Sequence, residues 1–262
     1  MIPITDIRAW GNVVPWKNAE QIEQDLVISR SLVEIYSDKY LSENLAFRGG
    51  TALHKLFLSP QPRYSEDIDL VQKEAGPIRD MITGLRTALA FLGEPKVKQK
   101  ANNNTLIFRF DSENISPVPL RLKVEMNCRE HFSVLGYKES AFSVDTRWFK
   151  GNTSIQTYEI EELLSTKLRA LYQRRKGRDL YDLYKAIIVS NPDPDKVLAC
   201  YGSYMDFSKG ISPTRKQFVN NLKEKIVDKD FVNDTISLLR HGENYNPEEA
   251  FNIVTETFLE KL

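Results

Sequence analysis

The sequence is poor in cysteine and in long apolar runs. Its two cysteines, Cys128 and Cys200, lie far apart and outside any zinc-like spacing, so we expect neither a disulfide framework nor a zinc site. No apolar run approaches the roughly 20 residues of a membrane-spanning helix, and the N-terminus lacks the basic start and apolar core of a signal peptide. These absences favour a soluble, cytoplasmic protein that does not bind a membrane.

The chain also lacks net charge and a P-loop. Its 36 Lys and Arg residues equal its 36 Asp and Glu residues, so a nucleic-acid site would have to be a local basic patch. The P-loop pattern G-x-x-x-x-G-K-[ST] does not occur. Apolar residues fill 41% of the 262 positions, which is enough for one large core or two smaller ones.

The hydrophobic pattern changes after about residue 150. Helical patterns mark residues 20–40, 51–58 and 77–92, and strand patterns mark residues 45–47, 67–71, 96–100, 105–110, 119–127 and 140–148. Later helices are expected over residues 159–175, 178–190, 195–204, 213–227 and 247–262. The sequence therefore predicts an α+β part, residues 1–155, followed by a helical part, residues 156–262.

Two aspartates alternate with apolar residues in the predicted strand 67–71. Residues two apart in a strand point the same way, so Asp67 and Asp69 are expected on one face and Ile68 and Leu70 on the other. Two neighbouring carboxylates repel each other, and each tends to hold a proton. Mg²⁺ between them would relieve the repulsion, because it prefers oxygen ligands and commonly binds carboxylates together with substrate phosphate.

A glycine pair precedes these acids by about fifteen residues. Gly49 and Gly50 would let the backbone approach a ligand, and the N-terminus of the following helix would attract an anion. Thr51 is expected to cap that helix.

Three further side chains could add to this predicted phosphate site. Lys55 would supply a positive charge, and Arg63 and Ser65 could contact phosphate. Taken alone, an alternating acid pair is commonly a solvated face and a glycine pair is commonly a simple helix start. Together they predict a phosphate cradle facing a metal site.

A third acid is available in the predicted strand 119–127. Glu125 falls on its polar face with Arg121 and Lys123. If this strand lies next to the strand of Asp67 and Asp69, Glu125 could complete a set of metal ligands.

A second cluster spans residues 163–187. Residues 163–178 hold six basic side chains and no acid, and Asp179 and Asp182 are neighbours on the next predicted helix. One interpretation is a solvated basic face that ends in salt bridges. The other is a functional site, in which Lys167 contacts a triphosphate or the attacking group and one of the aspartates orients a basic group or the acceptor.

These motifs together resemble the AbiEii-type nucleotidyltransferase toxins, within the polymerase β-like nucleotidyltransferase superfamily. The matching segments are "RGGTALHK", "RYSEDIDL" and "STKLRALYQRRKGRDLYDLY", which occur in the expected order between Arg48 and Tyr184. The resemblance implies a small mixed sheet with flanking helices, a helical C-terminal region that completes the active cleft, and Mg²⁺-dependent transfer of a nucleotide from an NTP.

The resemblance also assigns roles to residues. Gly50 and Thr51 match the glycine–hydroxyl motif, and Ser65, Asp67 and Asp69 match the acidic motif. Lys167 matches the lysine of the third motif, and either Asp182 or Asp179 matches the aspartate of the fourth. Glu125 falls where the superfamily often has its third acid.

The expected partners follow from the same resemblance. The acceptor would be RNA, with the tRNA 3′ end as the leading candidate and a block of translation as the consequence, and a cognate antitoxin protein would bind the enzyme. Two alternatives stay open at this point: transfer of AMP or UMP to a protein side chain, and a module that binds nucleotide without turnover.

Overall fold

The computed structural model describes residues 2–114, 116–208 and 212–262. Its contacts divide the chain into two units. The first contains residues up to Phe132 and then Tyr137–Tyr158, and the second contains Ser133–Gly136 and Glu159–Leu262. The fold class is α+β, as predicted, and none of the described helices has the length and apolar character needed to cross a membrane.

The first unit is built on one mixed sheet, which has seven strands among the described residues. In spatial order the strands are β3 (Lys96–Lys100), β4 (Asn103–Asp111), β5 (Pro119–Asn127), β2 (Asp67–Gln72), β1 (Leu45–Arg48), β7 (Lys150–Tyr158) and β6 (Tyr137–Asp145). Strand β2 pairs antiparallel with β1 and parallel with β5. The central position of β2 therefore places its residues between those of β1 and β5.

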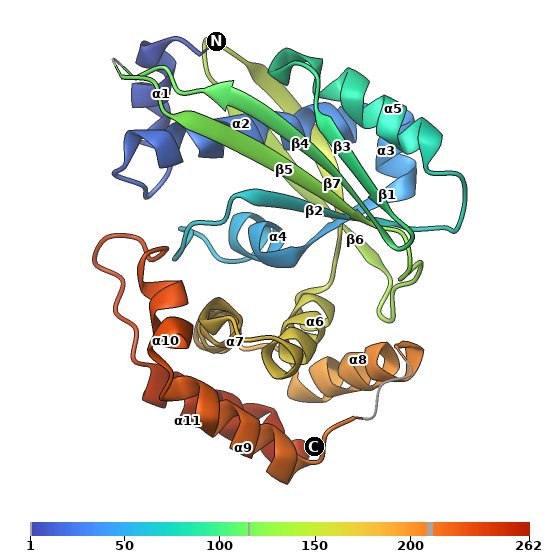
Figure 1. The fold of residues 1–262 in the computed structure, drawn as a ribbon, viewed down its shortest axis with the longest axis vertical. Helices are drawn as coiled ribbons and strands as arrows, with labels where there is room; N and C mark the ends of the chain where they lie inside the picture. Colours follow the sequence, from blue (N-terminus) through green and yellow to red (C-terminus); the bar gives the residue numbers. More distant parts are fainter. Residues whose placement is uncertain (1, 115, 209–211) are drawn as a thin grey trace. The chain divides into compact units, whose positions relative to one another are not determined.

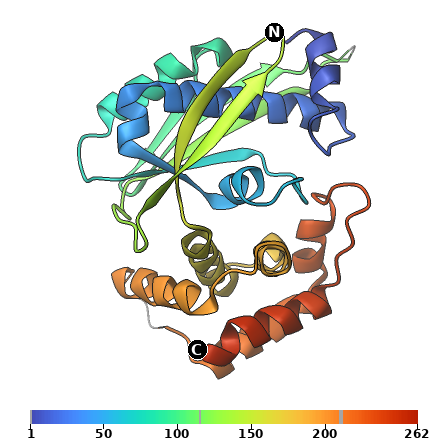
Figure 2. The same ribbon diagram turned by 180° about the vertical axis from the view of Figure 1, so that it is seen from behind.

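Helices cover one face of this sheet. The helices of the unit are α1 (Ile4–Trp10), α2 (Ala19–Ser37), α3 (Lys39–Asn44), α4 (Gly49–Leu56), α5 (Arg79–Ala88) and the short η1 (Ala90–Leu92). Figure 2 shows α2 crossing the sheet, and the opposite view shows β3, β4 and β5 in front of it (Figure 1). Alternate residues of β4 and β5, including Leu106, Phe108 and Val124, are fully buried and form the core on the helical side.

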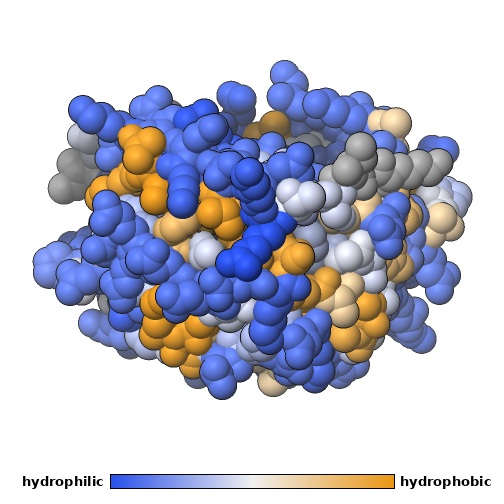
Figure 3. Space-filling view, turned by 90° about the horizontal axis from the view of Figure 1, so that it is seen from below, coloured by the Kyte–Doolittle hydropathy of each residue, from blue (hydrophilic) through white to orange (hydrophobic). Residues whose placement is uncertain are grey.

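The second unit is helical. Its elements are α6 (Ile160–Gln173), α7 (Gly177–Ser190), α8 (Pro194–Phe207), α9 (Arg215–Ile226), α10 (Lys229–Ile236), α11 (Pro247–Thr257) and η2 (Leu259–Lys261). Its buried core includes Leu168, Tyr181 and Phe218. Seen from below the view of Figure 1, the surface is mostly hydrophilic, with hydrophobic side chains in small separate groups (Figure 3).

A buried glutamate fixes residues 133–136 in the second unit. The Glu162 carboxylate is fully buried and accepts hydrogen bonds from the backbone N–H groups of Val134 and Leu135. It also accepts bonds from the hydroxyls of Ser133 and Tyr204. Four donors satisfy this carboxylate, which offsets the cost of burying it.

Several element predictions need correction. Strand β7 was not predicted, because Gly151 and Asn152 near its start are typical of turns, and the short helices α1 and α10 were also missed. The strand predicted over 140–148 runs over Tyr137–Asp145. The predicted helix 20–40 is two helices, since Asp38 ends α2 and caps α3 through its side chain.

Candidate active site

The acid pair lies at the start of the central strand β2. Asp67 and Asp69 are partly exposed, whereas Ile68 and Leu70 are buried on the other face. The alternation seen in the sequence therefore holds in the structure. Both carboxylates belong to the open face of the sheet, the one opposite α2.

Glu125 lies directly beside this pair. In the parallel register of β2 and β5, Asp69 is opposite Glu125 and Asp67 is opposite Lys123, so the predicted adjacency of the two strands is correct. The Glu125 carboxylate forms an ion pair with Lys123 at 2.5 Å. Within the described part of the chain, no three Asp, Glu, His or Cys side chains gather into a metal-binding group, so a metal role for Glu125 stays a prediction.

The environment of Asp67 fits a bound cation. The pKa of Asp67 is raised to about 6, with burial as the largest cause; the charges of Asp69, Glu66 and Glu125 add to this rise, and Lys123 opposes it. The ionised form is therefore poorly compensated in the protein alone. A divalent cation with a preference for oxygen ligands would supply the missing positive charge.

The glycine turn touches the acid pair. Gly49 has a φ of +83°, which lies in the region that favours glycine. A Cβ atom placed on Gly49 would lie 2.1 Å from Asp69 Oδ2, far inside any permitted contact. The backbone at the start of α4 and the Asp69 carboxylate thus occupy neighbouring positions, and only glycine fits between them.

Thr51 has a different role from the predicted one. Helix α4 begins at Gly49, two residues earlier than expected, and its N-cap is Arg48, whose side chain does not cap it. Thr51 is buried in the first turn, where its hydroxyl lies 2.9 Å from Ser65 Oγ and donates to the Asp67 carbonyl oxygen at 2.5 Å. Thr51 therefore fixes the start of α4 against the start of β2.

Lys55 and Arg63, two of the predicted phosphate contacts, both have partners within the protein. The Lys55 ammonium group is buried, forms an ion pair with Asp25 at 2.9 Å and donates to Ser29 Oγ at 3.0 Å. Arg63 is also buried and donates to the carbonyl oxygen of Tyr64. Lys55 thus joins α4 to α2 in the core.

Asp25 is the centre of that core network. Burial would raise the pKa of Asp25, but Lys55 and the indole N–H groups of Trp10 and Trp16 outweigh burial and lower it. The network fixes α4, whose first turn touches Asp69. The sequence did not reveal this network, because Asp25 and Lys55 lie thirty residues apart.

The second unit brings its three predicted residues together. Lys167 Nζ on α6 lies 2.8 Å from Asp182 Oδ2 and 3.3 Å from Asp179 Oδ1, both on α7. Both aspartates are fully buried. Burial would raise the pKa of Asp179, but Lys167 and the hydrogen bonds from Arg174 outweigh burial and lower it.

The remaining basic residues of segment 163–178 are largely paired as well. Arg175 forms an ion pair with Asp228 at 2.7 Å, and Lys176 pairs with Asp234 at 3.2 Å. Arg178 lies 3.9 Å from Asp234. The acids that neutralise these cations lie at the start of α10 and within it, an element that the sequence did not reveal.

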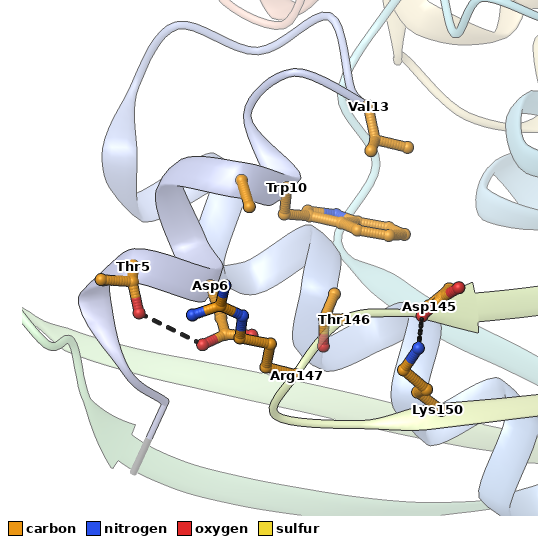
Figure 4. Close-up of a pocket in the computed structure, with 9 residues that line it drawn as sticks. Thr5, Asp6, Trp10, Val13, Asp145, Thr146, Arg147 and Lys150 are labelled. Carbon is orange, nitrogen blue, oxygen red and sulfur yellow. Dashed lines mark hydrogen bonds and ion pairs between the residues drawn. The ribbon is translucent and has the colours of Figure 1, made fainter.

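A separate cavity in the first unit contains none of the predicted site residues. Its volume is about 430 Å³, and it lies between α1 and the β6–β7 turn (Figure 4). Its lining includes Asp6, Trp10, Asp145, Arg147 and Lys150. Lys150 forms an ion pair with Asp145 at 2.7 Å, and Asp6 accepts a hydrogen bond from the Trp148 backbone N–H. Three of the charged side chains that line the cavity therefore have partners within the protein.

Comparison with known sequences gives a family match over most of the chain. A sequence model of the family described as "Nucleotidyl transferase AbiEii toxin, Type IV TA system" matches residues 30–256. A search of curated protein sequences gave no match.

Solved structures share the fold at low sequence identity. MenT4, a nucleotidyltransferase toxin from Mycobacterium tuberculosis H37Rv, aligns with a TM-score of 0.67 at 18% identity, over 100% of this chain and 91% of that one. A putative nucleotidyltransferase from Helicobacter pylori aligns with a TM-score of 0.55 at 16% identity, over 94% and 97% of the two chains. The H. pylori protein JHP933 aligns with a TM-score of 0.54 at 16% identity, over 94% and 95%.

Proposed function

Because this chain belongs to the AbiEii family of nucleotidyltransferase toxins of type IV toxin–antitoxin systems, we propose that it transfers a nucleoside monophosphate from an NTP to an RNA 3′ hydroxyl. The proposed acceptor is tRNA, and the consequence would be a block of translation. The proposed cofactor is Mg²⁺, and the proposed antagonist is a cognate antitoxin protein.

The acid pair carries this proposal. Asp67 and Asp69 share one face of β2, the pKa of Asp67 is raised to about 6, and Asp69 lies against Gly49. Mg²⁺ held there would neutralise the charge that develops on the transferred phosphoryl group and align the attacking and leaving oxygens. Asp67 and Asp69 would hold it, with Glu125 as the third candidate ligand.

The first turn of α4 would bind the phosphates. Its N-terminal N–H groups and the helix dipole favour an anion, and the N-cap side chain does not cap them. Thr51 holds this turn against β2, and Ser65 would add a hydroxyl to the phosphate contacts. The buried Lys55–Asp25 pair would act indirectly, by fixing α4 in this position.

The second unit would contribute Lys167. Asp179 and Asp182 hold its ammonium group in one place, which removes much of the conformational freedom that a long side chain loses on binding. We propose that Lys167 contacts a phosphate of the NTP or of the acceptor, and that Asp182 positions the acceptor.

Substitution of the acid pair tests the proposal. In Asp67→Ala and Asp69→Ala, transfer of label from α-³²P NTPs to total tRNA, and growth arrest on expression, should both be lost. Asp206→Ala, which removes an exposed aspartate of α8, should keep both activities. Full transfer by Asp67→Ala would refute the mechanism.

Digestion of the products identifies the acceptor. Label that is removed by RNase and resists protease is the expected result. Label that resists RNase and is removed by protease would identify a protein acceptor, and NTP binding without pyrophosphate release in any extract would identify a binding module.

A further inference from the structure

The open face of the sheet carries an unusual row of basic side chains. Lys96, Lys98 and Lys100 lie on the edge strand β3, and Arg109 and Arg121 lie on β4 and β5. All five are exposed. We call these five residues the basic sheet face.

The strand register connects this face to the acid pair. Lys98 pairs in register with Thr105, Thr105 with Glu125, and Glu125 with Asp69. Paired residues of neighbouring strands share a face of the sheet, and strands lie about 4.8 Å apart. Lys98 and Asp69 are therefore three strands apart in one row, which corresponds to about 14 Å across the sheet.

A second row runs beside the first one. It passes from Lys96 through Ile107 and Lys123 to Asp67. The basic sheet face and the acid pair are therefore parts of one continuous surface within the first unit.

The cations of this face have no carboxylate partner in the described part of the chain. Among the described residues, no carboxylate forms an ion pair with any of the five. Arg109 and Arg121 are directly opposite each other in the β4–β5 register, an arrangement of like charges that destabilises a sheet. A hollow of about 480 Å³ lies at these two arginines, so this end of the face is accessible to a ligand.

Among the described elements of the first unit, α2 packs on the opposite face of the sheet and not on this one. The described helix α2 lies behind the sheet when β3, β4 and β5 face the viewer (Figure 1) and in front of it in the reverse view (Figure 2). The buried residues of these strands, such as Leu106 and Leu122, point to the helical side. The basic side chains alternate with them and so point away from the core.

From this arrangement we propose that the basic sheet face binds the phosphate backbone of the acceptor RNA and leads its 3′ end to Asp67 and Asp69. The proposal rests on the function proposed above and adds where the acceptor is held. A row of unpaired cations complements a polyanion, and release of counterions from the RNA drives such binding. The side chains between the lysines of β3 and the residues of β5 are Thr105 and Ile107, neither of which offers a flat ring for base stacking, so the backbone rather than the bases would be recognised.

Lysines on an edge strand also prevent edge-to-edge pairing of sheets. That role accounts for Lys96, Lys98 and Lys100, but it does not account for Arg109 and Arg121, because β4 and β5 each have two neighbours in the sheet. The two arginines therefore provide an independent test.

Binding of RNA without turnover tests the proposal. The probe is a fluorescein-labelled RNA hairpin with a single-stranded 3′ end, and anisotropy is measured with Mg²⁺ and without NTP between 50 and 200 mM KCl. For the triple variant Lys96→Gln, Lys98→Gln, Lys100→Gln, affinity should fall at least about tenfold, and the slope of log K against log salt should decrease by about 2. For Arg109→Gln with Arg121→Gln, a smaller decrease of the same kind is expected.

Two matched variants control for charge and for folding. The triple variant Lys216→Gln, Lys223→Gln, Lys229→Gln removes the same charge from exposed lysines of α9 and the start of α10 and should bind within about twofold of the parent. Replacement of Lys96, Lys98 and Lys100 by Arg should retain binding. Light scattering separates aggregation at the strand edge from a loss of binding.

The outcomes distinguish this inference from the proposed function. Unchanged affinity in both the lysine triple and the arginine pair, or equal loss in the α9–α10 control, would overturn the basic sheet face as the RNA site even if transfer to RNA occurs. Loss of affinity confined to the basic sheet face supports it as the RNA site. A labelled product other than RNA would then overturn the acceptor role of the bound RNA, but not the binding of RNA by this face.

Discussion

The two units differ in how far their charged side chains are paired. In the second unit, Lys167 and Arg174 converge on buried Asp179, so that charges are matched inside the fold. In the first unit, Asp67 lacks a full counter-charge and the basic sheet face has no carboxylate partners among the described residues. The sequence left the state of the basic charges open, because its densest run of basic residues, at 163–178, could be either a face that ends in salt bridges or a functional site. Density of charge along the chain is therefore a poor guide to free charge in space.

Removal of a matched charge in the second unit should have the largest effect. In Asp179→Ala, Lys167 and Arg174 lose a buried partner, and we expect a loss of about 3–5 kcal/mol in the free energy of unfolding. Urea denaturation followed by circular dichroism measures it. Glu260→Ala, which breaks the exposed pair with Arg215, is the control and should cost under about 1 kcal/mol. A loss as small as that of the control would contradict the claim that buried, paired charges stabilise the second unit.

A side chain at the contact between the glycine turn and the acids should cost less stability but remove activity. Gly49→Ala introduces a Cβ at a φ of +83° that overlaps the Asp69 carboxylate. We expect a loss of about 1–3 kcal/mol in stability and a loss of nucleotide transfer. Gly93→Ala, at a φ of +80° with open space around it, separates backbone strain from the overlap and should keep transfer.

Removal of the poorly compensated Asp67 charge in the first unit should increase stability instead of decreasing it. The pKa of Asp67 is raised to about 6 in the folded protein, so ionisation above that pH costs the folded state free energy that the unfolded state does not lose. Asp67→Asn should therefore stabilise the metal-free protein above pH 6 by about 2 kcal/mol, a value reduced from the full shift because the group is partly exposed.

The pH profile identifies the cause of that gain. The gain should shrink as the pH falls from 6 to about 4, the ordinary range of an aspartate, and disappear below it. Millimolar Mg²⁺ should also remove it by stabilising the parent alone. Thermal unfolding from pH 4 to 8, with EDTA and with Mg²⁺, gives both results. A gain that is independent of pH would contradict the electrostatic explanation.

Exposed pairs in the second unit should show the smallest effect. Lys176 and Asp234 form a pair in which the lysine side chain is 47% exposed. Lys176→Gln should change stability by under about 0.5 kcal/mol, and it should leave RNA affinity nearly unchanged because this cation already has a partner. An effect on affinity as large as that of the basic sheet face would show that both basic regions bind RNA.

Strand alternation and local residue spacing could be predicted from the sequence, because they depend only on neighbours in the chain. They predicted β3 and β5 at their observed bounds and placed Asp67 with Asp69 on one face. The prediction that Glu125 lies beside this pair was correct, although it depended on a strand pairing that the sequence could only suggest. The sequence did not reveal the contacts of Lys55 and Thr51, whose partners Asp25 and Asp67 lie elsewhere in the chain, and the prediction that Thr51 caps α4 was wrong.

The basic sheet face was missed for a related reason. Its five cations are distributed over three strands, so no single strand segment of the sequence contains more than three of them. In contrast, segment 163–178 is visible as a cluster because its six cations lie within twelve residues of the chain. Their partners Asp228 and Asp234 come fifty or more residues later.

The sequence by itself determined the family and the local placing of the candidate site residues: the glycine turn, the acid pair, and the lysine and aspartates of the second unit. Their residue types and spacing depend only on short-range geometry. The tertiary structure alone decided which charges are free and which are neutralised, because electrostatic interactions depend on distances in space and on burial rather than on separation along the chain.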